Sequence, residues 1–151
     1  GYCVVLAGYV PLLRAATLCR LVEDTIASGA AAMVFTCVVD DAGANGRIVK
    51  DASGQVQKIV EAKDANEAEL AIGEYNTGVF CFRTSVLSAA LGQLTAKNKQ
   101  GEYYLTFTVA YLVGQGRPVA AVTTDDPDEV VGINTVAELA TAERILAQRG
   151  D

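Results

Sequence analysis

Two patterns of apolar residues alternate along the chain, one continuous and one at helical spacing. Continuous apolar runs at residues 2–7 and 31–39 are typical of strands that are buried on both faces. Residues 76–82 read as a third strand with an aromatic end. Further strands are expected at residues 118–123 and, briefly, at Val130–Val131. Because these runs alternate with helical stretches, the sequence predicts an α/β fold with a mixed, mainly parallel sheet.

Helical spacing of apolar residues predicts helices over residues 15–28, 84–94, 102–113 and 134–148. Thr84 is suited to cap the second of these helices. In the last helix, the spacing predicts an inner face made of Val136, Leu139, Ala140, Ile145 and Leu146.

A hairpin is expected between the long strands. Ile48–Val49 and Val56–Val60 read as short strands joined by turn residues 51–54. Residues 63–74 are polar and rich in Ala and Glu, which predicts a loop with one or two helical turns. Since no repeat or linker interrupts the sequence, we expect one domain over residues 1–151.

Charge narrows the range of partners. The 18 Asp and Glu residues outnumber the 12 Lys and Arg residues, which gives a net charge of −6. A chain without a basic footprint is a poor candidate for binding nucleic acid or an anionic membrane surface. No apolar run approaches the roughly 18 residues of a membrane span, and the first residues lack a basic signal-peptide region, so we expect a cytoplasmic protein.

Histidine and cysteine limit the chemistry. The chain has no histidine, which excludes Ser-His-Asp and Cys-His catalysis and His-ligated metals. The cysteines form no C-x-x-C pair, so the sequence has neither a zinc motif nor a thioredoxin-like motif. We expect the four of them to be reduced and buried: Cys3, Cys19, Cys37 and Cys81.

Six short motifs follow one another in a characteristic order. They read L-A-G-Y-V-P-L-L from Leu6, G-R-I from Gly46, I-V-E-A-K-D-A from Ile59, E-Y-N-T-G-V from Glu74, Q-G-E-Y-Y-L-T from Gln100 and V-G-I-N from Val131. Each motif alone is weak. Together, in this order, they closely resemble the uridylyltransferase domain of the bacterial bifunctional GlmU family. The match covers nearly the whole chain and corresponds to the second, C-terminal half of that nucleotidyltransferase domain.

This resemblance implies a Rossmann-like nucleotide-diphospho-sugar transferase fold. Members of the family transfer a uridylyl group from UTP to N-acetylglucosamine 1-phosphate, release pyrophosphate and use Mg²⁺. The resemblance therefore implies a sugar phosphate or a UDP-sugar as the ligand. Transfers of this kind depend on positioning and charge neutralisation more than on covalent help from the protein.

Matching motif positions give roles to five residues. Glu61 resembles the glutamate that accepts hydrogen bonds from sugar hydroxyls, and Asn76 resembles the asparagine that holds the sugar. Gly46 lies in a loop that resembles the one contacting the sugar through its backbone, and Thr77, together with Gly78, leaves room for the close approach of the sugar. Asn134 resembles the asparagine that helps to bind Mg²⁺ through its side-chain oxygen.

Departures from the family pattern concern catalysis. The family motif G-D-x-P-L places a magnesium-binding aspartate where this chain has Tyr9, a poor ligand for a hard cation. Smaller changes fall at Ala44, Asn45 and Phe107. The glycine-rich loop that cradles the triphosphate is absent, as is the C-terminal β-helix domain.

These departures lead us to expect weak or absent Mg²⁺ binding. We therefore expect a truncated relative that is catalytically impaired or non-catalytic and possesses at most a sugar-phosphate cleft. The alternative is an active UTP:N-acetylglucosamine-1-phosphate uridylyltransferase, if the chain is a fragment or if another chain completes it.

Simpler explanations exist for the same residues. Asn134 precedes a predicted helix, where asparagine is a good N-cap. Glu61 suits a solvated carboxylate at a strand end, and residues 76–78 suit a plain turn. Only the ordered set of motifs favours the functional interpretation.

The first strand lacks the residues that usually protect a sheet edge. No Lys, Pro or inward-facing charge interrupts residues 2–7, and in the family the sheet continues beyond this strand. We therefore expect this strand to lie at an open edge or to lack a covering helix. We also expect a homo-oligomer with the strand at residues 2–6 or its flanking helix at the interface, and twofold symmetry as the commonest form.

Overall fold

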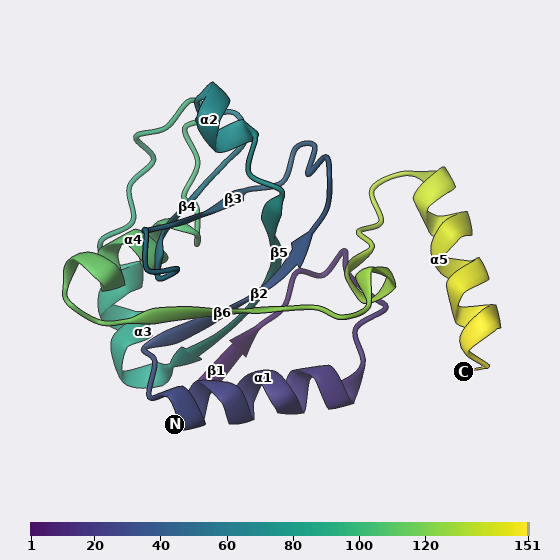
Figure 1. The fold of residues 1–151 in the computed structure, drawn as a ribbon, viewed down its shortest axis with the longest axis horizontal. Coiled ribbons are helices and arrows are strands. Elements are labelled where there is room, and N and C mark those ends of the chain that lie inside the picture. Colours follow the sequence, from purple (N-terminus) through teal and green to yellow (C-terminus); the bar gives the residue numbers. More distant parts are fainter. Residues whose placement is uncertain (151) are drawn as a thin grey trace.

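Six strands and five α-helices make up residues 1–150, the part of the chain that the computed structural model describes (Figure 1). The strands are β1 (Tyr2–Val5), β2 (Ala32–Val38), β3 (Arg47–Lys50), β4 (Val56–Val60), β5 (Glu74–Arg83) and β6 (Val119–Thr123). The α-helices are α1 (Ala15–Ser28), α2 (Glu67–Leu70), α3 (Thr84–Leu91), α4 (Phe107–Gly114) and α5 (Val136–Arg149), and a 3₁₀ helix, η1, spans Pro127–Val130.

All six strands form one mixed sheet with the order β4-β3-β5-β2-β6, and β1 pairs with β5. The predicted α/β class and mixed sheet are confirmed. The expectation of a mainly parallel sheet is wrong, because β2–β6 is the one parallel pairing among residues 1–150. A continuous apolar run indicates burial on both faces and not strand direction, so antiparallel strands between two helical layers show the same pattern.

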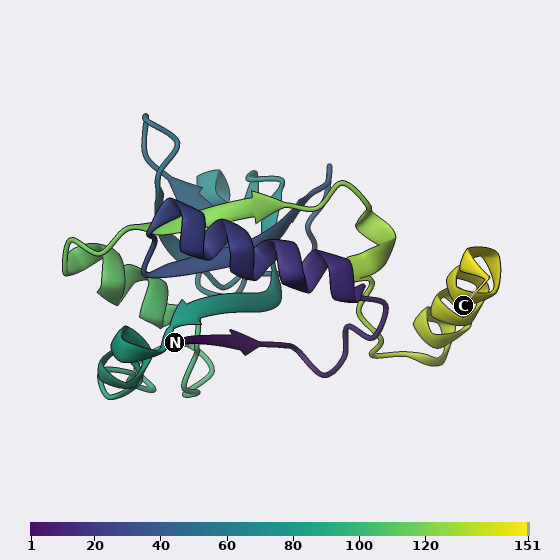
Figure 2. The same ribbon diagram turned by 90° about the horizontal axis from the view of Figure 1, so that it is seen from below.

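Helices cover both faces of the sheet (Figures 1 and 2). On one face, Leu21 of α1 packs with Met33 and Phe35 of β2 and with Cys81 of β5. On the other face, the side chains of α3 and α4 meet those of β2 and β5; the buried members include Val86, Ala90, Val109, Leu112, Val34, Phe80 and Phe82. The sheet is therefore the middle layer of the core.

Several predicted elements lie where the apolar pattern places them. The helix over residues 15–28 is α1, and it ends at Gly29, whose φ of 67° is left-handed. The predicted hairpin is β3–β4. The polar stretch at residues 63–74 contains the single turn α2.

Three predicted features differ from the structure. The helix expected from residue 102 begins at Phe107, because hydrogen-bonded turns occupy the residues just before it. Val130 and Val131 form no strand, since Val130 ends η1. Thr84 is the first residue of α3, whose N-cap is Arg83, and no side chain caps that helix.

The last helix, α5, departs furthest from its prediction. Ile145 is 7% exposed, but Val136, another residue of the predicted inner face, is 84% exposed. The helix projects from the body (Figures 1 and 2) and buries Ala142 and Ile145 in a small cluster with Leu12. Because α5 does not lie along the sheet, most of its predicted inner face has nothing to pack against.

The four cysteines are free. Cys37 and Cys81 are buried in the sheet as expected, and Cys3 is half-buried. Cys19 is exposed, contrary to expectation, because it lies on the solvent side of α1. Within residues 1–150, no helix combines the length and the apolar character that crossing a membrane requires.

β1 lies at an edge of the sheet, as the sequence predicts. It pairs with β5 on one side, and no other strand of residues 1–150 pairs with it. Tyr2 is 36% exposed, and Leu6, just after the strand, is 48% exposed. Whether this edge associates with another chain stays a prediction.

Candidate functional site

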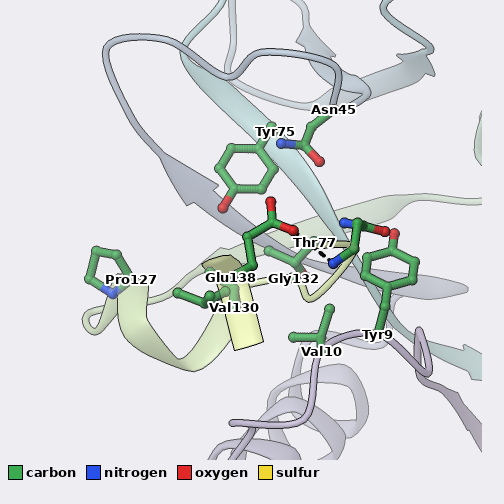
Figure 3. Close-up of a pocket in the computed structure, with 11 residues that line it drawn as sticks. Tyr9, Val10, Asn45, Tyr75, Thr77, Pro127, Val130, Gly132 and Glu138 are labelled. Atoms are coloured by element: carbon green, nitrogen blue, oxygen red, sulfur yellow. Dashed lines mark hydrogen bonds between the residues drawn. The ribbon is translucent and has the colours of Figure 1, made fainter. Parts of the chain in front are cut away.

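A cavity of about 270 Å³ opens beside the apolar cluster under α1 (Figure 3). It is bounded by the β1–α1 loop, the loop before β3, the first half of β5, and the segment from η1 to the first turn of α5. The lining residues are Tyr9, Val10, Asn45, Tyr75, Thr77, Pro127, Val130, Val131, Gly132, Asn134 and Glu138. Three of the sequence-selected residues, Tyr9, Thr77 and Asn134, therefore meet in one place.

Tyr9 lies between two glycines at the cavity and is 50% exposed. Its ring lies against Gly132, where an added methyl group would be 3.2 Å from Cδ2 of Tyr9. A methyl group on Gly78 would be 3.4 Å from its hydroxyl oxygen. The Tyr9 carbonyl accepts a hydrogen bond from the Ile133 N–H at 2.8 Å, which ties the β1–α1 loop to the segment before α5.

Asn134 shares this space with Tyr9. A methyl group on Gly132 would lie 3.7 Å from Nδ2 of Asn134. Its side-chain amide makes no hydrogen bond within residues 1–150. The interpretation of Asn134 as a helix cap is wrong, because Thr135 occupies the N-cap and its hydroxyl accepts from the Glu138 N–H at 3.2 Å.

Glu138 brings a negative charge to the cavity. Its Oε2 accepts from the backbone N–H groups of Asn134 and Thr135 at 2.7 and 2.8 Å and from the Thr135 hydroxyl at 3.0 Å. The Asn134 N–H and then the Thr135 groups favour the charged form, so they hold the pKa of Glu138 below its ordinary value. The carboxylate is therefore ionised at neutral pH and remains bound to the start of α5.

Tyr75 is a second aromatic wall of the cavity (Figure 3). It lies opposite Cys37 across the β2–β5 pairing. Burial raises the pKa of Tyr75 above its ordinary value, and the neighbouring Cys37 thiol adds to the rise. Tyr75 is therefore a neutral phenol at physiological pH.

A bulge in β5 sets the direction of its side chains at the cavity. Phe35 of β2 faces Val79, but the next residue, Thr36, faces Asn76, so Thr77 and Gly78 have no partner on β2. The interpretation of residues 76–78 as a plain turn is therefore wrong. The Thr77 hydroxyl donates to the Phe35 carbonyl at 2.7 Å and is committed to holding the bulge.

Glycine is required at the centre of this bulge. Gly78 has a φ of 81°, and a methyl group there would lie 2.7 Å from Cβ of Ala7. Both its backbone conformation and its close approach to Ala7, in the β1–α1 loop, exclude a side chain.

Gly46, Glu61 and Asn76 form a second cluster, beside the cavity but outside its lining. The Asn76 N–H donates to the Gly46 carbonyl at 2.8 Å. A methyl group on Gly46 would lie 3.3 and 3.4 Å from the two carboxylate oxygens of Glu61. The Thr106 hydroxyl donates to Oε1 of Glu61 at 2.7 Å, so this carboxylate is half-buried and partnered and not merely solvated.

Three of the four candidate sugar residues therefore lie in a site adjacent to the candidate metal residue, and the fourth, Thr77, lines the cavity with Asn134. β5 joins the two sites, because Asn76 belongs to the second cluster and the next residue, Thr77, lines the cavity. Successive side chains of a strand point to opposite faces of the sheet, so one strand contributes to both sites.

Arg47 supports the loop before β3, a role that the sequence analysis did not predict. Its side chain is 3% exposed, yet it has no ion pair within residues 1–150. It donates instead to backbone carbonyls of Ala42, Gly43, Asn45 and Leu70. Its position beside Gly46 in the G-R-I motif was the one feature that could have drawn attention to it. Its role could not be predicted, because any residue type can supply the backbone carbonyls that it binds.

An ion pair between buried Glu129 and half-exposed Arg14 braces the segment next to the cavity. Glu129 is 4% exposed and accepts from the Arg14 side chain at 3.1 Å and from the Arg14 N–H at 3.3 Å. Asp126 pairs with Arg14 at 2.8 Å and with Arg149 at 3.3 Å. These residues join the start of α1, η1 and the end of α5, and their separation in sequence hid the cluster from motif analysis.

The Mg²⁺ that the resemblance implies does not fit these residues. Hard cations take several carboxylate and carbonyl oxygens, but Tyr9 offers a phenol and Glu138 already holds the start of α5 through one oxygen. In the described part of the chain, no three His, Cys, Asp or Glu side chains lie together as a metal-binding group.

The chain is similar to several curated GlmU proteins. The GlmU bifunctional protein of Trichlorobacter lovleyi is 46% identical over 149 residues, which are 99% of this chain and 32% of that protein. The GlmU proteins of Geobacillus thermodenitrificans and Heliobacterium modesticaldum are 44% and 46% identical, with 99% and 97% of this chain covered. The chain spans about a third of the length of these curated relatives.

A family-wide pattern gives the same assignment. The sequence model described as "Nucleotidyl transferase" matches residues 2–130, which include β1 to β6 and the residues of both adjacent sites up to η1. The chain, similar to GlmU proteins over nearly all of its length, belongs to the nucleotidyl transferase family.

Proposed function

We propose that this chain corresponds to the second half of a sugar-nucleotidyltransferase domain, retains part of a sugar-phosphate site, and does not catalyse uridylyl transfer by itself. The observation that carries the proposal is the position of Tyr9. Its ring occupies the space between Gly78 and Gly132, beside the Asn134 amide, where the family pattern expects a magnesium-binding carboxylate.

Replacing the magnesium-binding aspartate by Tyr9 should slow the chemical step of uridylyl transfer. The reaction would join a phosphate oxygen of the sugar 1-phosphate to the α-phosphorus of UTP and break the bond to pyrophosphate. Negative charge accumulates on the transferred and leaving phosphates, so the rate depends on cationic groups at that point. Removing one such electrostatic element typically costs several kcal/mol of transition-state stabilisation.

Sugar recognition has more support. Glu61, Gly46 and Asn76 lie together and are all retained. Glu61 keeps Oε2 free of hydrogen bonds within residues 1–150, and Asn76 uses Oδ1 to accept from the Gly78 N–H at 3.0 Å, which leaves its NH₂ group to donate. One acceptor and one donor suit the hydroxyl and acetamido groups of an N-acetylhexosamine phosphate.

The first test is enzymatic. The chain, given UTP, N-acetylglucosamine 1-phosphate and Mg²⁺, is expected to release no measurable pyrophosphate above the protein-free control. Magnesium-dependent release that Asn134→Ala abolishes would show that the proposal of impaired catalysis is wrong.

The second test concerns binding. N-acetylglucosamine 1-phosphate is expected to bind at millimolar strength, about −4 kcal/mol. In an NMR titration, the shifted amides should cluster around Glu61 and Asn76. Asn76→Ala should abolish these shifts, and Gln148→Ala, which removes an exposed side-chain amide near the end of α5, should leave them unchanged. An unaffected Asn76→Ala variant would place the ligand elsewhere.

An active uridylyltransferase is the second candidate. Two findings favour it. The chain is 46% identical to a bifunctional GlmU protein over 99% of its own length, and it spans only about a third of that protein. On this view the chain works as one part of a larger enzyme. Turnover in a preparation that supplies a glycine-rich nucleotide loop, from the same or another chain, would favour it.

We further propose that the chain forms a homo-oligomer through the open edge of β1, and that it has no nucleic acid or membrane partner. The unpaired edge and the exposed Tyr2 and Leu6 side chains support the first part. The net charge of −6 supports the second.

A further inference from the structure

The Q-G-E-Y-Y-L-T motif ends in a side chain that has no role in the function described so far. Thr106 occupies the N-cap of α4, where a threonine hydroxyl usually accepts a hydrogen bond from the first turn of the helix. Here it makes no such bond. The hydroxyl donates instead to Oε1 of Glu61 at 2.7 Å, across 45 residues of sequence.

The Thr106 hydroxyl is placed for this one contact. Thr106 is 5% exposed, so water does not compete freely for its hydroxyl. A buried hydroxyl that donates to a carboxylate makes a charge-assisted bond, which is stronger than a bond between neutral groups. The start of α4 therefore has no side-chain cap, because the Thr106 hydroxyl binds Oε1 of Glu61 instead.

Gly46 limits the same carboxylate from another side. A methyl group on Gly46 would lie 3.3 Å from Oε2 and 3.4 Å from Oε1 of Glu61, and 3.1 Å from Cγ2 of Ile59. The carboxylate therefore rests against the bare Gly46 backbone. With Oε1 bound to Thr106, its plane and direction are set before any ligand arrives.

We propose that Thr106 is a positioning residue for sugar recognition: it holds Glu61 through Oε1, so that Oε2 is presented as a pre-oriented acceptor for a sugar hydroxyl. This inference rests on the proposed sugar site. Pre-orientation reduces the side-chain freedom lost on binding, so it acts on affinity without Thr106 touching the ligand.

The chain offers matched variants for the test. Thr106→Val keeps the shape of the side chain and removes the hydroxyl, and Thr106→Ser keeps the hydroxyl. The control is Thr108→Val, because the Thr108 hydroxyl is also near the start of α4 but donates to the Leu105 carbonyl. The dissociation constant for N-acetylglucosamine 1-phosphate is measured by NMR titration for each variant.

Thr106→Val is expected to weaken binding about tenfold, and Thr106→Ser and Thr108→Val to change it less than about twofold. In the Glu61→Gln background, Thr106→Val should have little further effect, since its partner is already altered. Equal affinities of wild type and a folded Thr106→Val variant would overturn the proposal, and so would an additive effect of the two substitutions.

Ligand-free measurements separate this proposal from the proposed function. The urea midpoints of the wild type, Thr106→Val, Glu61→Gln and the double variant form a double-mutant cycle. This cycle measures the Thr106–Glu61 contact in the absence of sugar. If the unfolding cycle shows coupling but the wild type binds no N-acetylglucosamine 1-phosphate, the sugar site is rejected, and with it a recognition role for Thr106. If the effects of the two substitutions on unfolding are additive, the Thr106–Glu61 contact is rejected, whether or not the sugar binds.

Discussion

Tyr9 changes both the charge and the shape of the cavity. An aspartate at this position would be short and negative, whereas the tyrosine ring reaches from Gly132 to Gly78. Gly132 leaves enough room for the ring, so no neighbour has to move to accept it. The candidate metal residue, Asn134, remains at the cavity.

Exchanging that one side chain should therefore restore metal binding. In Tyr9→Asp, a carboxylate replaces the ring beside Asn134, and weak Mg²⁺ or Mn²⁺ binding should appear, at least about tenfold tighter than in the wild type. Catalysis should not return with it. Isothermal titration calorimetry with MnCl₂ measures the affinity.

The matched control for this exchange is Tyr9→Asn. It removes the ring to the same extent but adds no charge, so it separates the effect of space from that of the carboxylate. Equal metal affinity in the wild type and Tyr9→Asp would show that position 9 does not face the metal site.

At the scale of elements, the bulge in β5 connects strand pairing to the site. Gly78→Ala should lower the free energy of unfolding by about 1–3 kcal/mol, because a φ of 81° strains alanine and its methyl group would meet Cβ of Ala7. Urea denaturation measures the loss. Adding Ala7→Gly should recover the part that comes from the clash but not the backbone strain.

Gly114→Ala is the control for this substitution. Gly114 lies at the end of α4 with no atom near the place of a new methyl group, so the change should be neutral or slightly stabilising. If Gly78→Ala proves as harmless as this control, the bulge does not depend on glycine.

The elements also show how far sequence patterns reach. Apolar runs predict where strands lie, because burial on both faces leaves a direct signature in residue type. They do not predict that β5 runs antiparallel between β1 and β2, because direction depends on the connections. The inner face of α5 was predicted wrongly for a related reason. Spacing shows that a helix has an apolar side, but it does not show what that side packs against, which here is Leu12, Val131 and Ile133.

For the site, the motifs identified residues that do converge. Glu61, Gly46 and Asn76 lie together, and Asn134 meets Tyr9. The supporting residues Arg47 and Thr106 escaped prediction of their roles, since one binds backbone carbonyls and the other a carboxylate far along the chain.

At the scale of the molecule, the open edge of β1 predicts association. The chain should form a dimer or higher oligomer at micromolar concentration. Val4→Lys, shown by circular dichroism to be folded because Val4 also packs under α1, should weaken the assembly if the edge is the contact. Light scattering measures the mass. Ala110→Lys adds the same charge on the exposed side of α4 and should leave the assembly intact.

A mass of 15.8 kDa for the wild type at these concentrations would contradict the prediction. A dimer that is equally stable in Val4→Lys and Ala110→Lys would move the interface to another surface.

The projection of α5 has a consequence for how the molecule opens. Ala142, Ile145 and the Arg149 contacts to Leu12 and Asp126 are its main attachments, so its amide hydrogens should exchange with solvent well before those of β2 and β5. Asn134 and Glu138 line the cavity from the start of this helix. A molecule bound there would slow the exchange, which makes the deuterium uptake of α5 a label-free report on whether the cavity is occupied.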